Sequence, residues 1–238
     1  MPASDNAALY FHIMLQPFGS IVHRLRTWGE ALLDALLPPR ARSARTKQRT
    51  ICDIPLSPVT HELLGSRITA LMDYRQPAVQ DLIQALKYDR SDYAARLAAH
   101  VLADFLREEI HSRKIFSAQK IILAPIPLHS TRMRERGYNQ ITKVLEALPR
   151  EFHDGSLTHV ALNALVRTRA TPRQTHLPRH ERLSNVAGAF ALHDQSHMVN
   201  AHIVLIDDVV TTGATLIHAK HVFRSTGLSV SLIALARA

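Results

Sequence analysis

The chain has 238 residues, of which 46% are hydrophobic and 21% are charged, a composition that is typical of a globular protein with one full core. No apolar run approaches the roughly 20 residues that cross a bilayer. No basic segment precedes the partly apolar stretch 9–22, so we expect a cytoplasmic protein without a secretory signal or membrane span. The single cysteine, Cys52, excludes an intramolecular disulfide and a multi-cysteine zinc cluster.

The formal net charge of +9 favours anionic partners such as phosphates, pyrophosphate or nucleic acid. The arginines and lysines concentrate in three segments, 38–50, 132–136 and 167–182. The first segment contains five basic residues and no acidic one, and such a run is either a solvated linker or a binding surface.

The N-terminal part, residues 1–65, is weakly patterned. Residues 28–37 favour a short helix that ends before Pro38, and the basic segment 38–50 is expected to be a linker. Cys52 is expected to be a small buried residue, because no neighbouring residue supplies a base that would activate its thiol. We therefore expect an N-terminal extension over residues 1–65 and a folded domain over residues 66–238.

From Ile68 onwards, helices and strands alternate. Pro77 suits the first position of a helix whose apolar residues continue to Leu86, and Ser91 suits the cap of a longer helix. The remaining expected elements are strands at 120–126, 160–166, 187–192, 202–206 and 228–235 and helices at 141–148 and 214–225, the last ended by Gly227. Strands alternating with helices predict an α/β fold with a doubly wound, mainly parallel sheet and helices on both faces.

The most informative segment is 203–215. Four apolar residues predict a buried parallel strand, and Asp207 and Asp208 follow where that strand is expected to end. A glycine turn rich in hydroxyl groups then leads into a helix, whose first N–H groups attract an anion. Two carboxylates would repel that anion, so they suit hydroxyl groups or a cation. A sugar phosphate, with an anion at one end and hydroxyls nearby, fits both halves.

This segment resembles the phosphoribosyl pyrophosphate (PRPP) signature of the type I phosphoribosyltransferases. The resemblance implies that Asp207 and Asp208 hold the ribose 2′- and 3′-hydroxyls. It also implies that a loop holds the 5′-phosphate, made by Thr211, Thr212, Gly213, Ala214 and Thr215. The alternative is a pair of aspartates that caps a helix or binds magnesium in another α/β fold. The sequence of a phosphate-binding P-loop does not occur in the chain.

A second constellation follows the strand expected at 120–126. Pro125 and Pro127 fix the backbone there, and either could follow a cis peptide bond. Arg132 and Arg136 offer planar, permanently charged groups suited to phosphate oxygens. The segment resembles the pyrophosphate loop of the same fold, which would include Pro127, Leu128 and His129. The pattern Pro-x-Pro-Leu-His…Arg-x-x-x-Arg-Gly-Tyr-Asn-Gln resembles ComF-type proteins, a phosphoribosyltransferase-like family linked to competence for DNA uptake.

Two further stretches resemble the same family. Residues 71–88 include Asp73-Tyr74 and Leu86-Lys87-Tyr88, and they resemble the region ahead of its core. Residues 167–190 resemble its long catalytic loop, which would close over pyrophosphate with Arg167 and Arg182. The alternative for this loop is an exposed hairpin. ComF-type proteins commonly begin with a four-cysteine zinc module, which one cysteine cannot form, so no zinc is expected and the role of residues 1–65 stays open.

The resemblance implies a reaction in which a nitrogen nucleophile displaces pyrophosphate from the anomeric carbon of PRPP. Asp207 and Asp208 would fix the ribose, and Mg²⁺ with Arg132, Arg136 and the loop arginines would stabilise the leaving group. The ligand's own oxygens would mainly hold the Mg²⁺, with the two aspartates as its candidate protein ligands. No pattern identifies the acceptor, a general base or the oligomeric state.

Two other functions are consistent with the sequence. The protein could sense PRPP or a nucleotide without turnover, or it could act with single-stranded DNA or competence proteins, which the net charge and segment 38–50 favour. The low aromatic content, 5%, limits stacking on bases. A metal-dependent phosphatase that uses Asp207 and Asp208 is weaker, because the threonine-rich loop would then have no role.

Overall fold

A six-stranded sheet forms the centre of the protein in a computed structural model that describes residues 41–114, 119–128, 130–155, 158–168, 189–193 and 198–238. The strand order is β1-β2-β8-β7-β3-β4. The strands are β1 (Val59–Leu63), β2 (Ser66–Asp73), β3 (Lys120–Pro125), β4 (His159–Val160), β7 (Ala201–Val210) and β8 (Ser229–Arg237). All neighbouring pairs are parallel except β1 and β2, which confirms the prediction of a mainly parallel sheet. The carboxyl ends of β2, β3, β7 and β8 therefore meet at one edge.

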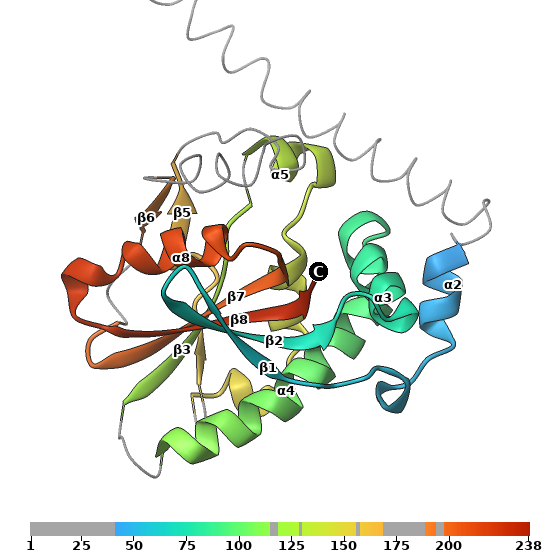
Figure 1. Ribbon diagram of the computed structural model, residues 1–238, viewed down its shortest axis with the longest axis horizontal. Coiled ribbons are helices and arrows are strands. Elements are labelled where there is room, and N and C mark those ends of the chain that lie inside the picture. Colours follow the sequence, from blue (N-terminus) through green and yellow to red (C-terminus); the bar gives the residue numbers. More distant parts are fainter. Residues whose placement is uncertain (1–40, 115–118, 129, 156–157, 169–188, 194–197) are drawn as a thin grey trace, which may run out of the picture. The chain divides into compact units, whose positions relative to one another are not determined.

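Helices cover both faces of this sheet, as predicted (Figure 1). On one face α3 (Pro77–Tyr88), α4 (Asp92–Lys114) and α6 (Gln140–Glu146) bury a large apolar cluster that includes Leu82, Leu102 and Val144. On the other face α8 (Ala214–His221) and a two-stranded ribbon of β5 (Leu165–Arg167) and β6 (Phe190–Leu192) enclose a second cluster around Phe223. Within the described part of the chain, no helix has both the length and the apolar character needed to cross a membrane.

Most expected elements are present, with shifted ends. Ser91 caps the start of α4, where its Oγ accepts a hydrogen bond of 3.2 Å from Ala94 N. The strand expected at 160–166 is divided between β4 and β5, which belong to different sheets. Helix α8 ends at His221, and a short 3₁₀ turn at Arg224–Thr226 precedes Gly227, which has a φ of +70°. Helix α5 (Ser130–Arg136) was not predicted. The helix expected at 28–37 lies outside the described residues.

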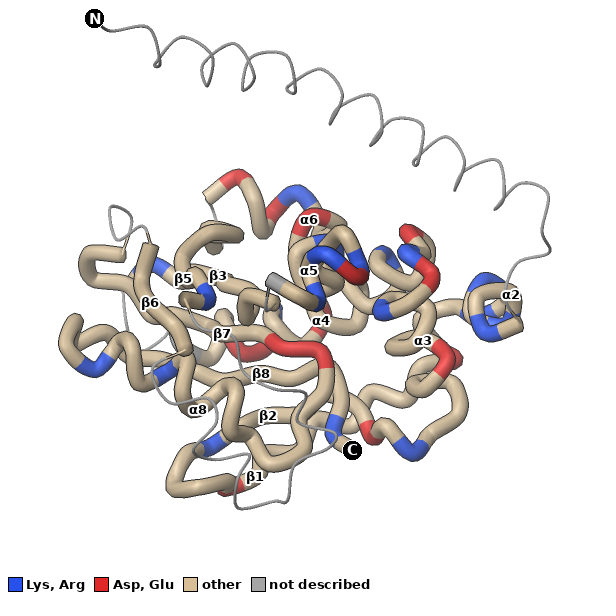
Figure 2. The backbone as a smooth tube through the Cα atoms, turned by 90° about the horizontal axis from the view of Figure 1, so that it is seen from above, with Lys and Arg blue, Asp and Glu red and all other residues tan. Residues whose placement is uncertain are grey.

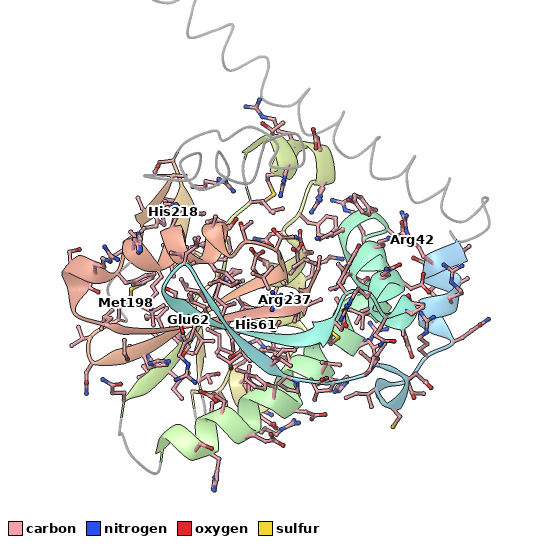
Figure 3. All side chains as sticks on the ribbon, viewed as in Figure 1. Arg42, His61, Glu62, Met198, His218 and Arg237 are labelled. Atoms are coloured by element: carbon pink, nitrogen blue, oxygen red, sulfur yellow. The ribbon has the colours of Figure 1, made fainter. Side chains whose placement is uncertain are left out.

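The predicted linker 38–50 contains a helix, α2 (Ala41–Lys47), followed by a 3₁₀ turn at Ile51–Asp53. Arginines of this segment form ion pairs with acidic residues of α3 and of its C-terminal cap, and these pairs hold the segment to the domain. Figure 2 shows the basic residues concentrated along α2, and Figure 3 labels Arg42 on this helix. The partners are Arg45 and Arg49 with Asp81, and Arg42 with Asp89. The linker interpretation was wrong, because it counted the charges without their distant partners.

The compact unit extends from Arg42 to Ala238 and so includes α2 and β1, which the sequence left in the N-terminal extension. Cys52 is exposed, contrary to the prediction that it is buried. It lies in the short 3₁₀ turn, and Ile54, two residues later, is the side chain that this turn buries.

Candidate functional site

Asp207 and Asp208 lie inside strand β7, not after it. The strand continues to Val210 because β8 pairs with it as far as Arg237, and Ala238 N donates a hydrogen bond of 3.1 Å to Val210 O. The predicted strand end at residue 206 was therefore too early. Successive side chains of a strand point to opposite faces, so the two carboxylates enter different environments.

The Asp207 face borders a shallow hollow that is open to solvent and lined by Asp207 and by residues 209–216. The structure places Thr211, Thr212, Gly213, Ala214 and Thr215, the residues expected to form a phosphate loop, around this one space. Gly213 has a φ of +79° and precedes the first residue of α8. The positive end of the α8 dipole and its first N–H groups are therefore at the hollow.

The turn at Gly213 packs tightly against side chains of β1 and β2. A Cβ atom at this position would lie 2.7 Å from Ile68 Cδ1 and 3.3 Å from Leu63 Cβ. The first hydrogen bond of α8 runs from Ile217 N to Gly213 O at 3.0 Å, and Thr212 Oγ1 accepts a 3.4 Å bond from Ala214 N. Glycine is required here both by the left-handed backbone and by the close approach of β1 and β2.

Asp208 is buried and is held by donors from three elements. Lys87 Nζ, at the end of α3, lies 3.1 Å from its Oδ1, and the side-chain amide of Gln140, at the start of α6, donates to its Oδ2. The backbone N–H of Val209 also donates to Oδ1, at 2.5 Å. Lys87 and Gln140 therefore belong to the site. The sequence placed both in recognisable segments but gave neither a role.

Asp207 has a strongly perturbed acidity. Burial, and then the adjacent Asp208 carboxylate, raise the pKa of Asp207 to about 7, against the opposing effects of the Asp208 N–H, Lys87 and Arg132. The Asp208 backbone N–H donates a hydrogen bond of 2.8 Å to Asp207 Oδ1. A carboxyl group with this pKa can change its protonation state when a ligand or cation arrives near neutral pH.

Two of the predicted arginines act on Asp207 from other elements. Burial and the charge of Arg132 on α5 lower the pKa of Arg167, whereas the Asp207 carboxylate raises it. The Arg167 guanidinium lies 5.3 Å from the ring centre of Phe190, its partner in the β5–β6 ribbon. Arg132, Arg167 and Asp207, predicted from separate motifs, are therefore close enough to interact electrostatically.

Arg136 contacts the Asp208 side of the site instead. Its Nη1 donates a hydrogen bond of 3.3 Å to Gln140 Oε1, and its guanidinium carbon lies 5.3 Å from the ring centre of Tyr88. Gln140 therefore accepts from Arg136 and donates to Asp208, which fixes the orientation of its amide.

The Gly-Tyr-Asn part of the second motif is structural. Asn139 Oδ1 accepts a 2.9 Å bond from Ile141 N and so caps α6, while its Nδ2 donates a 2.9 Å bond to Ile126 O beyond β3. The Tyr138 hydroxyl donates to Leu86 O near the end of α3. Gly137 has a φ of +74°. These contacts set the positions of α3 and α6, and so of Lys87 and Gln140.

The remaining predicted residues are partly accounted for. Pro127 and Leu128 are half-buried and follow β3, whose end pairs with β7 at Ile206. The described peptide bonds before Pro125 and Pro127 are trans. His129 and Arg182 lie outside the described residues. Within the described ranges, no three histidine, cysteine, aspartate or glutamate side chains come together to hold a metal ion.

These features define a doubly wound α/β protein whose candidate site lies at the carboxyl edge of the sheet, the usual place for a ligand in this class. The site combines a glycine turn at a helix N-terminus, one carboxylate that lines the hollow and arginines from two neighbouring elements.

Comparisons with known proteins identify relatives of this chain. No protein-family model matches the chain. It is 31% identical over 212 residues to the DNA utilization protein YhgH of Escherichia coli O6:H1, which covers 83% of this chain and 88% of the relative. It is 30% identical over 159 residues to competence protein F of Haemophilus influenzae, with 66% and 67% covered. It is 30% identical over 166 residues to competence protein ComFC of Streptococcus pneumoniae, with 70% and 66% covered.

The chain therefore belongs to the ComF family of competence proteins, as its motifs indicated. Among solved structures, a hypoxanthine phosphoribosyltransferase from Staphylococcus aureus aligns with a TM-score of 0.35 and 12% identity, over 62% of this chain and 75% of that one.

Proposed function

We propose that this protein binds PRPP at the carboxyl edge of its sheet and transfers the phosphoribosyl group to a nitrogen acceptor, with release of pyrophosphate. The observation that carries the proposal is the convergence of the Gly213 turn and Asp207 on one hollow, with Arg132 and Arg167 acting on the same carboxylate.

The two halves of the hollow suit the two ends of a sugar phosphate. The turn and the N-terminus of α8 supply N–H and hydroxyl donors for the 5′-phosphate. Asp207 supplies a carboxylate that accepts hydrogen bonds from ribose hydroxyls. With the sugar held at both ends, a nitrogen acceptor can approach the anomeric carbon as the bond to pyrophosphate breaks.

Charge stabilisation at the leaving group is assigned to Arg132, Arg136 and Arg167, because negative charge builds up on the departing pyrophosphate. One hollow-facing carboxylate suits Mg²⁺ carried in by phosphate oxygens, since this cation is commonly held by one or two carboxylates together with its substrate. Bound in this way, Mg²⁺ would neutralise charge on the pyrophosphate.

The test is a calorimetric titration of PRPP, with Mg²⁺ present, into the parent and into the Asp207→Asn variant. We expect binding in the parent and at least a tenfold loss of affinity in the variant, since a hydrogen bond to a charged group contributes about 1.5–3 kcal/mol. Asp104→Asn, which changes an exposed aspartate of α4, is the matched control and should bind as the parent does. A folded parent that does not bind PRPP would refute the proposal.

A second candidate function is binding of single-stranded DNA, which one surface feature favours. Two arginines, Arg42 and Arg136, lie 5.4 Å and 5.3 Å from the ring centre of Tyr88. Tyr88 is 56% exposed. Exposed aromatic rings beside basic groups are how many proteins bind single strands. The names of the relatives, DNA utilization and competence proteins, agree with such a role.

A further inference from the structure

An arginine and a histidine form a polar pair at the β1 side of the sheet. Arg237, the last residue of β8, donates a hydrogen bond from Nη1 to Nδ1 of His61 on β1 (Figure 3). Both residues are half-buried. The sequence motifs gave neither of them a role.

This pair lies next to the Gly213 turn. Arg237 is the register partner of Val210, which lines the hollow. His61 is the register partner of Ile68, so the two side chains share one face of the β1–β2 pair, and Ile68 packs against the Gly213 turn. The guanidinium and the imidazole are therefore on the face of the sheet that carries the hollow.

The positive charge of Arg237 has no acidic partner among the residues that the structure describes. Asp73 is its register partner on β2, but both oxygens of that carboxylate accept hydrogen bonds from Arg75. The bond to His61 uses only Nη1. The edge formed by Nε and Nη2, which binds a carboxylate through two parallel hydrogen bonds, is left for a ligand.

His61 adds a donor to the pair but no charge. Because Nδ1 accepts from Arg237, the ring proton is on Nε2, which can donate. Burial, and then the charge of Arg237, lower the pKa of His61, so the imidazole is neutral near neutral pH. The pair thus combines one positive charge with donors from two side chains. One charge matches a carboxylate better than a phosphate, which carries up to two negative charges.

We propose that Arg237 and His61 form an anion subsite beside the PRPP site, which binds a carboxylate group of the nitrogen acceptor. This inference rests on the proposed function and names the class of acceptor, a nitrogen compound that bears a carboxylate. The 5′-phosphate is assigned to the Gly213 turn and the pyrophosphate to other arginines, so PRPP does not use the pair. A bound carboxylate supplies the counter-charge for Arg237 and orients the acceptor.

Acetate is the probe for this subsite, and the imidazole ¹⁵N signal of His61 is the readout. Acetate replaces chloride at constant ionic strength in a solution of ¹⁵N-histidine-labelled protein saturated with PRPP and Mg²⁺. The signal that is missing from His61→Gln identifies the reporter. We expect a saturable shift in the parent and an acetate affinity at least about tenfold weaker in Arg237→Gln, which lacks the charged donors. The PRPP affinity of Arg237→Gln should be unchanged.

Two variants control the titration. Arg67→Gln removes a positive charge from an exposed residue of β2 whose side chain points to the face opposite Ile68, and it should respond to acetate as the parent does. Arg237→Lys keeps the charge without the planar fork and should recover only part of the affinity. It also replaces Arg237→Gln if that variant does not fold.

The titration is repeated without PRPP and with inorganic phosphate. No saturable shift in the parent, or an equal response in Arg237→Gln, would overturn the proposal. A shift that PRPP abolishes would overturn it too, because the pair would then bind PRPP itself, and tighter binding of phosphate would overturn the assignment to a carboxylate. A parent that does not bind PRPP would refute the proposed function whatever the His61 signal does. A parent that binds PRPP but does not respond to acetate would refute this inference alone.

Discussion

At Asp207, the arrangement that suits ligand binding also lowers the stability of the fold. Its carboxyl is half-buried beside a second carboxylate, and the folded chain therefore holds its proton much more tightly than the unfolded chain does. Such a group lowers the stability of the fold progressively as the pH rises from its pKa in the unfolded chain to its higher pKa in the folded chain. The destabilising Asp207 carboxyl lies where a bound ligand or cation would stabilise its ionised form, which is typical of functional sites.

Asp207→Asn should therefore stabilise the fold at alkaline pH. The pKa of Asp207 is raised from 3.8 to about 7. The stability of the parent should fall as the pH rises through this window, and the asparagine variant should lack that fall. The full shift corresponds to about 4 kcal/mol, but the side chain borders open solvent, so we expect the variant to gain about 1–2 kcal/mol at pH 8 relative to pH 5.

Urea unfolding of parent and variant at the two pH values checks this prediction. Asp104→Asn is again the control, because Asp104 is 49% exposed and its replacement should give the same difference at both pH values. An Asp207→Asn variant that gains nothing between pH 5 and pH 8 would contradict the raised pKa.

At the scale of elements, the turn between β7 and α8 depends on one glycine. Gly213→Ala should destabilise the protein and weaken PRPP binding, because alanine pays about 1–2 kcal/mol at a positive φ and its Cβ would also push the turn away from Ile68. Gly227→Ala is the matched control: its φ is +70°, but a Cβ there meets nothing within 4 Å. We expect both variants to lose stability in urea unfolding, Gly213→Ala more, and only Gly213→Ala to lose PRPP affinity in titration. Equal effects of the two substitutions would show that packing under the turn does not matter.

The elements that the sequence predicted are those with local signals. A buried apolar run and the Gly213 turn determine β7 and the start of α8, and Pro77 and Ser91 mark the starts of α3 and α4. Helix α2 depends instead on Arg45, whose partner Asp81 is 36 positions away. The contact between Gln140 and Asp208 spans 68 positions. Such pairings follow from the topology, so the spacing of residues within a motif does not reveal them.

At the scale of the whole molecule, the net charge of +9 is unevenly compensated. The basic run that suggested a nucleic-acid surface pairs Arg42, Arg45 and Arg49 with acidic partners in and just after α3. Basic residues also gather on α5, where Arg134 is exposed (Figure 2). We therefore expect an extended polyanion, such as single-stranded DNA, to bind at α5 and the neighbouring Tyr88 rather than at segment 38–50.

The dependence of DNA binding on salt tests this distribution. If the protein binds an oligothymidine, Arg134→Ala should lower the magnitude of the slope of log affinity against log salt by about 0.7, the value expected for one lost phosphate contact on a single strand. Arg45→Ala should leave the slope unchanged, because Asp81 already neutralises that guanidinium. Tyr88→Leu should weaken binding by about 1–3 kcal/mol without altering the slope, since stacking on a base releases no counterions.

Fluorescence anisotropy over a salt series measures all three variants. A parent whose affinity for the oligonucleotide is negligible at low salt would eliminate the DNA-binding function, and a smaller slope in Arg45→Ala than in Arg134→Ala would locate the surface on α2 instead.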